Sequence, residues 1–448
     1  MAKKIRNKKQ MWIYIILLVL TGIGVGIYYL IDNKVLNVGN SSNDTSNNVN
    51  NNQPPTLEFS GYVRPPVGVE FSFKNDETKK FVSTYSHFDS PGVSKTEKAW
   101  SVDKTQGEQE VSEAANIVNV LDYFKQYFNN ENIFFMGDTN IKYKNQNAAF
   151  NETYLNQQGY NFLFEDDKNY STSLSSTFNN FANPYDKIIY KLKDFYQSKN
   201  YDDLSSALVS NVNNGFLINT YKTLPTISNP AYSGNGWVNV DEKQLWQATD
   251  DKGNNKYDEN DLFYRYVKYG ISDHIPVGLN IKDNANNEAR IGFWNVLNLS
   301  FTDSEIQSDS SKVETPTKQK ANAHTRNLAD IIYNANFDLI GLVEINKNTP
   351  LKNFEYFIKY LNDKNKTKDN GKLYEGFLTI NTNSSVASSG QTEQVAIIYN
   401  ANLLKLNEVV YPKFYKSENN AILDNKIVKN ISIYLNNNLT LNKNKNGL

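Results

Sequence analysis

The stretch Ser272–Asn298, "SDHIPVGLNIKDNANNEARIGFWNVLN", places two apolar segments on either side of a polar link. "HIPVGLNI" and "RIGFWNVLNL" are short segments rich in β-branched and aromatic residues, a composition that favours strands. The link from Asn280 to Ala289 is long enough to join neighbouring antiparallel strands. His274 stands before the first strand and Asn295 near the end of the second, so the stretch predicts a sheet with polar groups at its strand ends.

The composition allows a large globular protein and excludes several chemistries. The chain has 448 residues, 39% of them hydrophobic and 13% aromatic, so it can bury one large domain or two ordinary ones. Its net charge of −1 gives no sign of a surface that coats nucleic acid, although a catalytic groove can still be locally basic. The absence of cysteine excludes disulfides, thiolate zinc sites and cysteine nucleophiles.

The N-terminal region predicts a membrane anchor. Residues 1–10 are basic, and residues 11–31 are apolar without a charge, about the length that a helix needs to span a bilayer. A cleaved signal peptide fits less well, because its apolar region is usually only ~7–15 residues long. We therefore expect a cytoplasmic tail at 1–10, a single transmembrane helix at 11–31, an Asn-rich tether at 32–58 and an extracellular remainder at the cell membrane.

From residue 59 onward, predicted strands alternate with predicted helices. "KKFVSTYSHF", "NIFFMGDTNI", "DLIGLVEI" and "EQVAIIYN" have the character of strands, and "TRNLADIIYNA" has that of a helix. Residues 201–268 are less regular and are interpreted as an insertion, while residues 413–448 form an Asn- and Lys-rich tail. The mixture predicts an α/β domain whose function lies at strand ends and in loops.

Several of these strand ends carry groups that could do chemistry. Any one such residue is more often an ordinary turn or strand-end residue than a catalyst. Taken together, carboxylate and amide oxygens suit a hard cation such as Mg²⁺, and two imidazoles beside them suit the hydrolysis of a phosphate ester. The residues concerned are His87, Asp89, Asp138, Asn140, Asp186, Asp273, His274, Asn295, Glu344 and Glu393.

Seven of these stretches resemble motifs of the endonuclease/exonuclease/phosphatase (DNase I-like) superfamily. They are "SHFDSPG", "GDTN", "YDKI", "SDHIPV", "RIGFWNVLN", "LVEIN" and "TEQVA", and within the superfamily they are most similar to the membrane nucleases of mycoplasmas. The resemblance covers most of residues 60–410. It implies an α/β fold in which two sheets form a sandwich with helices outside.

The order of the motifs departs from the family. In the family the strand with "WNVLN" opens the domain and "SDHIPV" closes it, whereas here the closing motif comes first. The resemblance therefore implies a circularly permuted domain, with the C-terminal-type half at 59–282 and the N-terminal-type half at 289–412. Permutation is tolerated when the original termini lie close together and the new ones fall in an exposed loop.

The resemblance also implies a metal site. Glu344 would be the main ligand of a divalent cation, with Asn295 and Asp273 nearby. Mg²⁺ is the expected ion, with Ca²⁺ and Mn²⁺ as alternatives. Asp138 and Asn140 would orient the attacking water and the scissile phosphate.

The acid/base pair and the substrate contacts follow from the same resemblance. His274 held by Asp186 and His87 held by Glu393 would act across the phosphate, since a carboxylate behind an imidazole fixes its tautomer and stabilises its charged form. Lys187, together with Asn140, would contact the substrate.

These features predict a membrane-anchored extracellular nuclease that hydrolyses phosphodiester bonds of DNA, with RNA as a second candidate substrate. Two alternatives stay open. One is a lipid phosphodiesterase of the sphingomyelinase type, and the other is an inactive rearranged remnant that acts only as a surface protein. The sequence indicates nucleic acid and the membrane as partners and points to no protein partner.

Overall fold

The two strands around the polar link form an antiparallel hairpin. β9 (Val277–Asp283) pairs with β10 (Glu288–Leu299) in a register that runs from Val277 opposite Phe293 to Lys282 opposite Glu288. The Asp283 carboxylate closes the turn by accepting a hydrogen bond from the backbone N–H of Asn287 at 2.8 Å. Asn286 has a φ of 67°, a left-handed conformation that Asn adopts more readily than most residues. The predicted pairing across the link is confirmed.

A computed structural model describes residues 61–93, 97–198, 204, 209–212, 215–224, 236–301, 316–368, 371–379, 393–410 and 432–434. All of these residues belong to one compact unit. The expected cytoplasmic tail, membrane anchor and tether at 1–58 lie outside the described residues. Within the described part, no helix has both the length and the apolar character needed to cross a bilayer.

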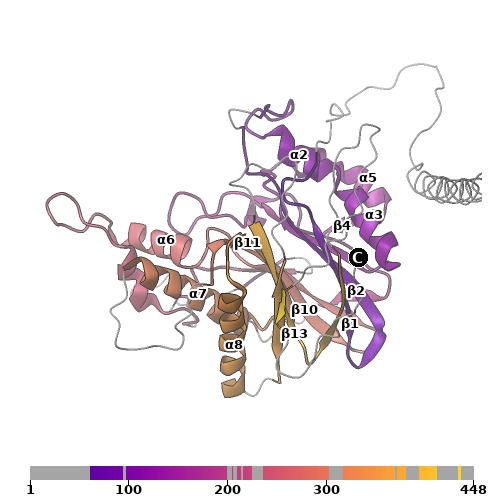
Figure 1. Cartoon of the computed structure of the whole chain (residues 1–448). Coiled ribbons are helices and arrows are strands. Elements are labelled where there is room, and N and C mark those ends of the chain that lie inside the picture. The colour runs from indigo at the N-terminus through magenta and orange to yellow at the C-terminus, as the bar shows by residue number, and fades with distance from the viewer. Residues whose placement is uncertain are drawn as a thin grey trace, which may run out of the picture. The chain divides into compact units, whose positions relative to one another are not determined.

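The strands within the described ranges form two mixed sheets (Figure 1). The smaller sheet has six strands in the order β14 (Leu404–Val410), β1 (Val67–Phe73), β2 (Asp76–His87), β3 (Ile133–Asp138), β5 (Asp186–Lys191) and β4 (Asn161–Phe162). The larger sheet has nine, in the order β15 (Ser432–Tyr434), β12 (Tyr374–Leu378), β13 (Glu393–Asn400), β11 (Leu339–Asn346), β10, β9, β8 (Gly215–Ile218) and β7 (Val209–Val212), with β6 (Phe195–Ser198) also paired to β9.

A shared apolar core joins the two sheets. It contains Phe81 and Met136 from the smaller sheet and Ile291, Val343 and Ile397 from the larger one, all buried. Buried aliphatic and aromatic side chains of this kind each stabilise the fold by roughly 1.5–3 kcal/mol. The predicted α/β class with two sheets is confirmed.

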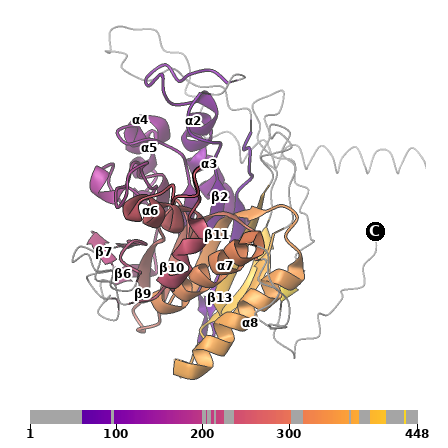
Figure 2. The same cartoon turned by 90° about the vertical axis from the view of Figure 1, so that its left-hand side faces the viewer.

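Helices cover the outer faces of both sheets (Figures 1 and 2). A second core lies under α2 (Glu108–Ala115), α3 (Ile117–Phe128), α4 (Gln146–Phe150) and α5 (Glu152–Gln157) on the smaller sheet. A third lies under α6 (Glu259–Gly270), α7 (Pro316–Ala335) and α8 (Leu351–Lys368) on the larger sheet. Two 3₁₀ helices, η1 (Lys168–Tyr170) and η3 (Val240–Trp246), occupy the connections.

The helices form where apolar residues recur at helical spacing. In α3 the side chains of Ile117, Leu121 and Phe124 are fully buried on one face, as a period of 3.6 residues requires. Asn129 ends α3 in the left-handed conformation with φ 48°, a common helix stop. Crossover helices of this kind let β2 and β3 lie parallel.

Segments from both sides of the hairpin build each sheet. β14, which follows β13 in the chain, pairs with β1 in the smaller sheet. Residues 201–268, expected to be an insertion, contribute β8 to the larger sheet and α6 to the core outside it. In the expected tail at 413–448, Ser432–Tyr434 pairs with β12, and the remainder lies outside the described residues.

Candidate active site

Three site residues lie together where neighbouring strands of the smaller sheet end or begin. β2 and β3 run parallel and end side by side, with His87 opposite Asp138. β5 runs antiparallel to β3 and begins with Asp186 opposite Asp138. The strand pairing therefore brings an imidazole and two carboxylates to one point from residues that are far apart in the sequence.

The larger sheet supplies Asn295 and two glutamates at irregular positions. The pairing of β10 with β11 shifts register after Asn295, and the pairing of β11 with β13 shifts between Leu342 and Ile345. Glu344 lies in this second irregularity with a φ of 60°, a left-handed conformation that costs a non-glycine residue roughly 1–3 kcal/mol. β13 begins with Glu393. The irregularity directs the Glu344 carboxylate toward the residues of the smaller sheet.

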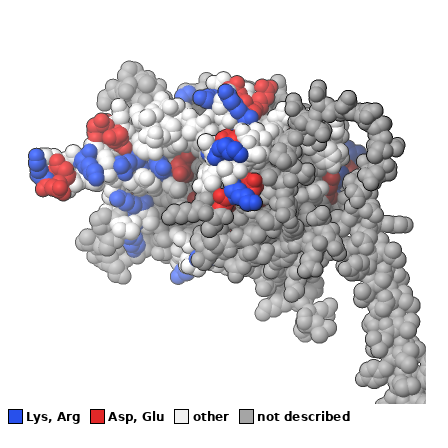
Figure 3. All heavy atoms as spheres, turned by 90° about the horizontal axis from the view of Figure 1, so that it is seen from above, with Lys and Arg blue, Asp and Glu red and all other residues white. Residues whose placement is uncertain are grey.

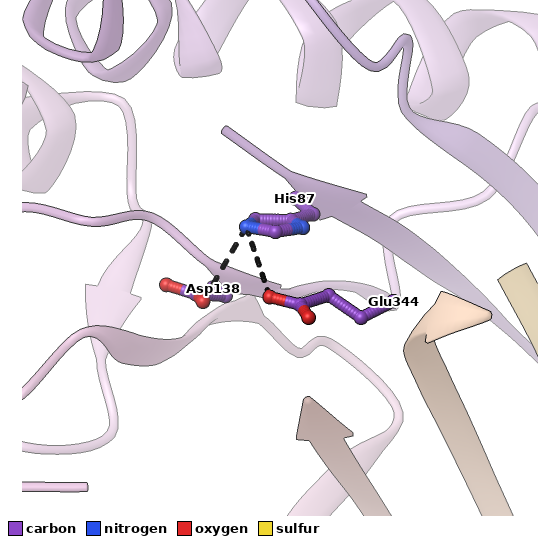
Figure 4. Close-up of side chains that lie close together, drawn as sticks. All are labelled: His87, Asp138 and Glu344. Atoms are coloured by element: carbon purple, nitrogen blue, oxygen red, sulfur yellow. Dashed lines mark ion pairs between the residues drawn. The ribbon is translucent and has the colours of Figure 1, made fainter. Parts of the chain in front are cut away.

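One ring nitrogen of His87 faces the carboxylates of Asp138 and Glu344 (Figure 4), and the other faces Glu393. Its Nδ1 lies 2.9 Å from Oε2 of Glu393, while its Nε2 lies 3.6 Å from Oδ2 of Asp138 and 3.9 Å from Oε1 of Glu344. The amide nitrogen of Asn140 lies 3.4 Å from the same Nε2. The bond to Glu393 fixes the ring, so Nε2 is the nitrogen that faces the other site residues.

His274 has a matching arrangement. Its Nδ1 lies 2.7 Å from Oδ2 of Asp186, and its Nε2 lies 3.6 Å from Oδ2 of Asp138. The indole N–H of Trp294 donates to the His274 carbonyl at 2.9 Å. Both imidazoles therefore have a carboxylate behind them and share the Asp138 carboxylate in front.

The Asn295 side chain ties Asp138 to Glu344. Its amide nitrogen donates to Oδ2 of Asp138 at 2.8 Å and to Oε1 of Glu344 at 2.9 Å. Its oxygen accepts a hydrogen bond from the backbone N–H of Leu297 at 3.1 Å. In this arrangement Asn295 positions two carboxylates through its nitrogen, whereas we expected it near the metal as a ligand.

Both histidines have raised pKa values. Burial and the Arg64 charge lower the pKa of His87, but the Glu393 and Asp138 carboxylates outweigh them and raise it. Burial also lowers the pKa of His274, but the charges of Asp186 and Asp138 raise it by more. The pKa of His274 therefore lies well above the usual value. His274 is therefore charged over a wider pH range than an ordinary histidine.

The pKa values of Asp138 and Glu344 shift in opposite directions. Burial raises the pKa of Asp138, but the two histidines and the Asn295 amide outweigh it, and the pKa falls below its ordinary value. Burial also raises the pKa of Glu344, with a further rise from Glu393, and the neighbouring histidines do not fully compensate. Negative charge at Glu344 is therefore incompletely balanced by the protein itself.

Arg64 is a site residue that the sequence did not reveal. Its Nε lies 2.8 Å from Oε1 of Glu393, and its Nη1 donates to the carbonyl of Phe88 at 2.6 Å. It therefore fixes both the carboxylate behind His87 and the backbone just after it. The only signal in the sequence is rarity, since Arg64 is one of five arginines.

Arg64→Gln is expected to raise the pKa of His87 in the metal-free protein. The guanidinium lowers that pKa through its charge, and its removal leaves Glu393 and Asp138 to act unopposed. An NMR titration of the three histidines measures the shift, with Arg265→Gln as a matched control on α6. A fall in the His87 pKa, or an equal rise in the control, would contradict this role.

Asp273 and Lys187 lie outside the clusters around Asp138. The Asp273 carboxylate belongs to neither of the described His and acidic clusters there, but it is close enough for its charge to help raise the pKa of His274. Its backbone carbonyl accepts from Leu174 N–H at 2.7 Å. Lys187 follows Asp186 directly in β5, so its side chain points to the opposite face of the sheet. There its ammonium is buried with no hydrogen-bond partner among the residues that the structure describes, and burial lowers its pKa to about 8.

His324, the third histidine of the chain, lies inside α7. Its Nε2 is buried, and burial lowers its pKa to about 4. The α7 helix begins at Pro316, earlier than the apolar pattern from Thr325 indicates. His324 is thus a neutral, half-buried helix residue.

The donor set fits a hard divalent cation. Asp138 and Glu344 each offer a carboxylate oxygen, and these oxygens and a ring nitrogen of His87 all lie within 4.8 Å of one another. Imidazole suits softer metals than Mg²⁺, so the two carboxylates are the ligands that a hard cation would use. The Glu344 side chain is 18% exposed, whereas that of Asp138 is 1% exposed, so a cation here would have solvent on the Glu344 side. Mg²⁺ typically keeps several waters and takes one or two carboxylates, which matches this arrangement.

The chain is 46% identical over 130 residues to an uncharacterized protein of Mycoplasma pneumoniae. The match covers 29% of this chain and 26% of that protein. No protein-family model matches the chain.

Proposed function

We propose that the chain is a metal-dependent phosphodiesterase that cleaves DNA, and RNA as a second substrate. The observation that carries the proposal is the pair of imidazoles, His87 and His274, that share Asp138 in front and each have a carboxylate behind. Hydrolysis of a phosphodiester needs a base for the attacking water and an acid for the leaving oxygen. The motif resemblance to a circularly permuted DNase I-like nuclease, anchored by residues 11–31, supports the same proposal.

The two imidazoles have different tasks in the proposed reaction. The pKa of His274 lies well above its usual value, so His274 enters protonated and gives its Nε2 proton to the leaving oxygen as the phosphorus–oxygen bond breaks. Arg64 restrains the rise in the pKa of His87, so His87 loses its proton more readily than it would beside Glu393 and Asp138 alone. In the proposed reaction its unprotonated form takes a proton from the attacking water. Proton exchange with solvent then restores both residues.

The remaining residues bind and orient. Glu344 and Asp138 would hold the cation, which supplies charge stabilisation for the phosphate oxygens. Asn140 directs its amide toward Nε2 of His87 and so would position the phosphate next to the base. Asn295 keeps the two carboxylates together.

Figure 3 shows charged side chains on the described part of one face of the molecule. Basic and acidic side chains of the described residues are interspersed on that face. This agrees with the net charge of −1 and favours an enzyme that engages nucleic acid locally over a protein that coats it.

Purified full-length protein should cut plasmid DNA in the presence of Mg²⁺ and lose this activity on chelation. Structured RNA and sphingomyelin vesicles tested in parallel separate the substrate classes. Cleavage of sphingomyelin alone would favour the lipid phosphodiesterase, and a folded protein that hydrolyses none of these substrates would favour the inactive remnant.

A further inference from the structure

We propose that Asp89, Glu97 and Glu110 form a second cation site, separate from the group around Asp138, and that this site takes Ca²⁺. Each residue offers a carboxylate oxygen, and the three oxygens lie within 4.8 Å of one another. Ca²⁺ binds six to eight oxygens at about 2.3–2.6 Å, so ligands on opposite sides of the ion are separated by about this span.

Glu110 supplies an oxygen that the protein leaves unused. The side chain is fully buried at the start of α2. Its Oε1 accepts hydrogen bonds from Gly107 N–H at 2.8 Å, Gly92 N–H at 3.0 Å and the Gln106 amide at 2.6 Å. Its Oε2 is buried and accepts no hydrogen bond from an N–H or hydroxyl group of the described residues; it faces the Glu97 carboxyl, with which it can share a proton. A buried carboxylate oxygen without a donor destabilises the fold unless a cation or a proton meets it.

The free oxygen of Glu110 points toward Glu97. Oε2 of Glu110 and Oε1 of Glu97 both lie so close to Gly107 that a Cβ at that position would collide with them. The Glu97 oxygen accepts a hydrogen bond from the backbone N–H of Gln109 at 2.8 Å, which fixes its position. Two carboxylates are therefore crowded together in a partly buried place.

No lysine or arginine within the described ranges forms an ion pair with Glu97 or Glu110. Lys142 is nearby, and its ammonium donates to the carbonyl of Thr105. Burial, and then the charge of Glu110, raises the pKa of Glu97 to about 7. Like charges this close require either a bound cation or a shared proton, and the third carboxylate, Asp89, favours the cation.

Two hydrogen-bonded links connect this cluster to the candidate active site. Asp89 lies two residues after His87, and its backbone N–H is held by Glu113 at 2.8 Å. Gln106 donates both to Glu110 and to the carbonyl of Asn140, the latter at 3.1 Å. A cation here would therefore order the segment that follows β2 and stabilise the supports of the site, whether or not the chain is a nuclease.

Calcium binding to full-length protein tests the site without any enzyme assay. Isothermal titration with CaCl₂ at pH 8 and thermal unfolding with and without CaCl₂ are measured in the Glu344→Gln background, which weakens the first site. We expect Glu110→Gln in this background to lose one equivalent of Ca²⁺ and the Ca²⁺-dependent rise in unfolding temperature. Glu97→Gln should do the same, and Glu108→Gln, a matched change in the same turn of α2, should leave both unchanged.

The amide in Glu110→Gln can still accept the three hydrogen bonds at Oε1, so a folded variant is expected. If that variant does not fold, Glu97→Gln alone decides the question. Equal Ca²⁺ binding with and without these substitutions would overturn the proposal, as would a Ca²⁺-insensitive unfolding temperature in the Glu344→Gln protein. The latter result would indicate a shared proton at Glu97 and Glu110.

Discussion

Glu344→Gln is expected to reduce Mg²⁺-dependent DNA cleavage by roughly 10²- to 10³-fold, because a hard cation loses a charged ligand and the several kcal/mol of transition-state stabilisation that it supplies. The substitution keeps the shape of the side chain and an oxygen that can accept from Asn295, as Glu344 does at 2.9 Å. The fold should therefore survive. Initial rates measured across a Mg²⁺ titration separate weaker metal binding from slower chemistry.

Glu355→Gln is the matched control for this change. Glu355 lies in α8, outside the site, and loses the same charge, so its cleavage rate should match that of the wild type. Undiminished cleavage by a folded Glu344→Gln protein at low Mg²⁺ would remove Glu344 from the metal site. Equal losses in both variants would indicate a general effect of charge on binding to DNA.

The sequence predicted elements best where apolar periodicity was strong. β9, β10 and β11 were recognisable as short apolar runs, and the helix at α7 as an amphipathic one. α8 was missed although Phe354, Phe357, Ile358 and Leu361 recur at helical spacing and are buried. Lys and Asn residues between them obscured the pattern, since those residue types suggest loops as readily as helices.

Site residues were predictable where a motif combined a strand with its polar end. His87, Asp138 and Asp186 come together because β2, β3 and β5 are neighbours in one sheet. Lys187 follows Asp186 directly in β5, and adjacent residues of a strand face opposite sides of the sheet. Asp186 and Lys187 could not both point into one site.

Other features of the site depend on tertiary structure alone. Arg64 reaches Glu393 only because β1 and β13 belong to sheets that pack together. The left-handed backbone at Glu344 arises from a register shift between strands, and no local sequence pattern marks such a shift.

His274→Ala is expected to reduce the cleavage rate on the order of 10²- to 10⁴-fold, the range for loss of an acid or base group. The stronger test is Asp186→Asn, which leaves the imidazole in place. Burial lowers the pKa of His274, and the charge of Asp186 raises it. The Asp186 carboxylate lies 2.7 Å from Nδ1 of His274. Without that charge the pKa of His274 falls.

The direction of the pH effect follows from the proposed role of His274. An acid must be protonated, so activity is full below the pKa of His274 and declines as the pH rises through it. Asp186→Asn should therefore shift the alkaline limb of the kcat profile to lower pH. His324 cannot produce this limb, because burial lowers its pKa to about 4.

Asp251→Asn, a change at an exposed aspartate, is the matched control and should leave the limb in place. A uniform loss of activity without a shift would mean that Asp186 only holds the ring, and an acidic limb that moves instead would mean that His274 acts as the base.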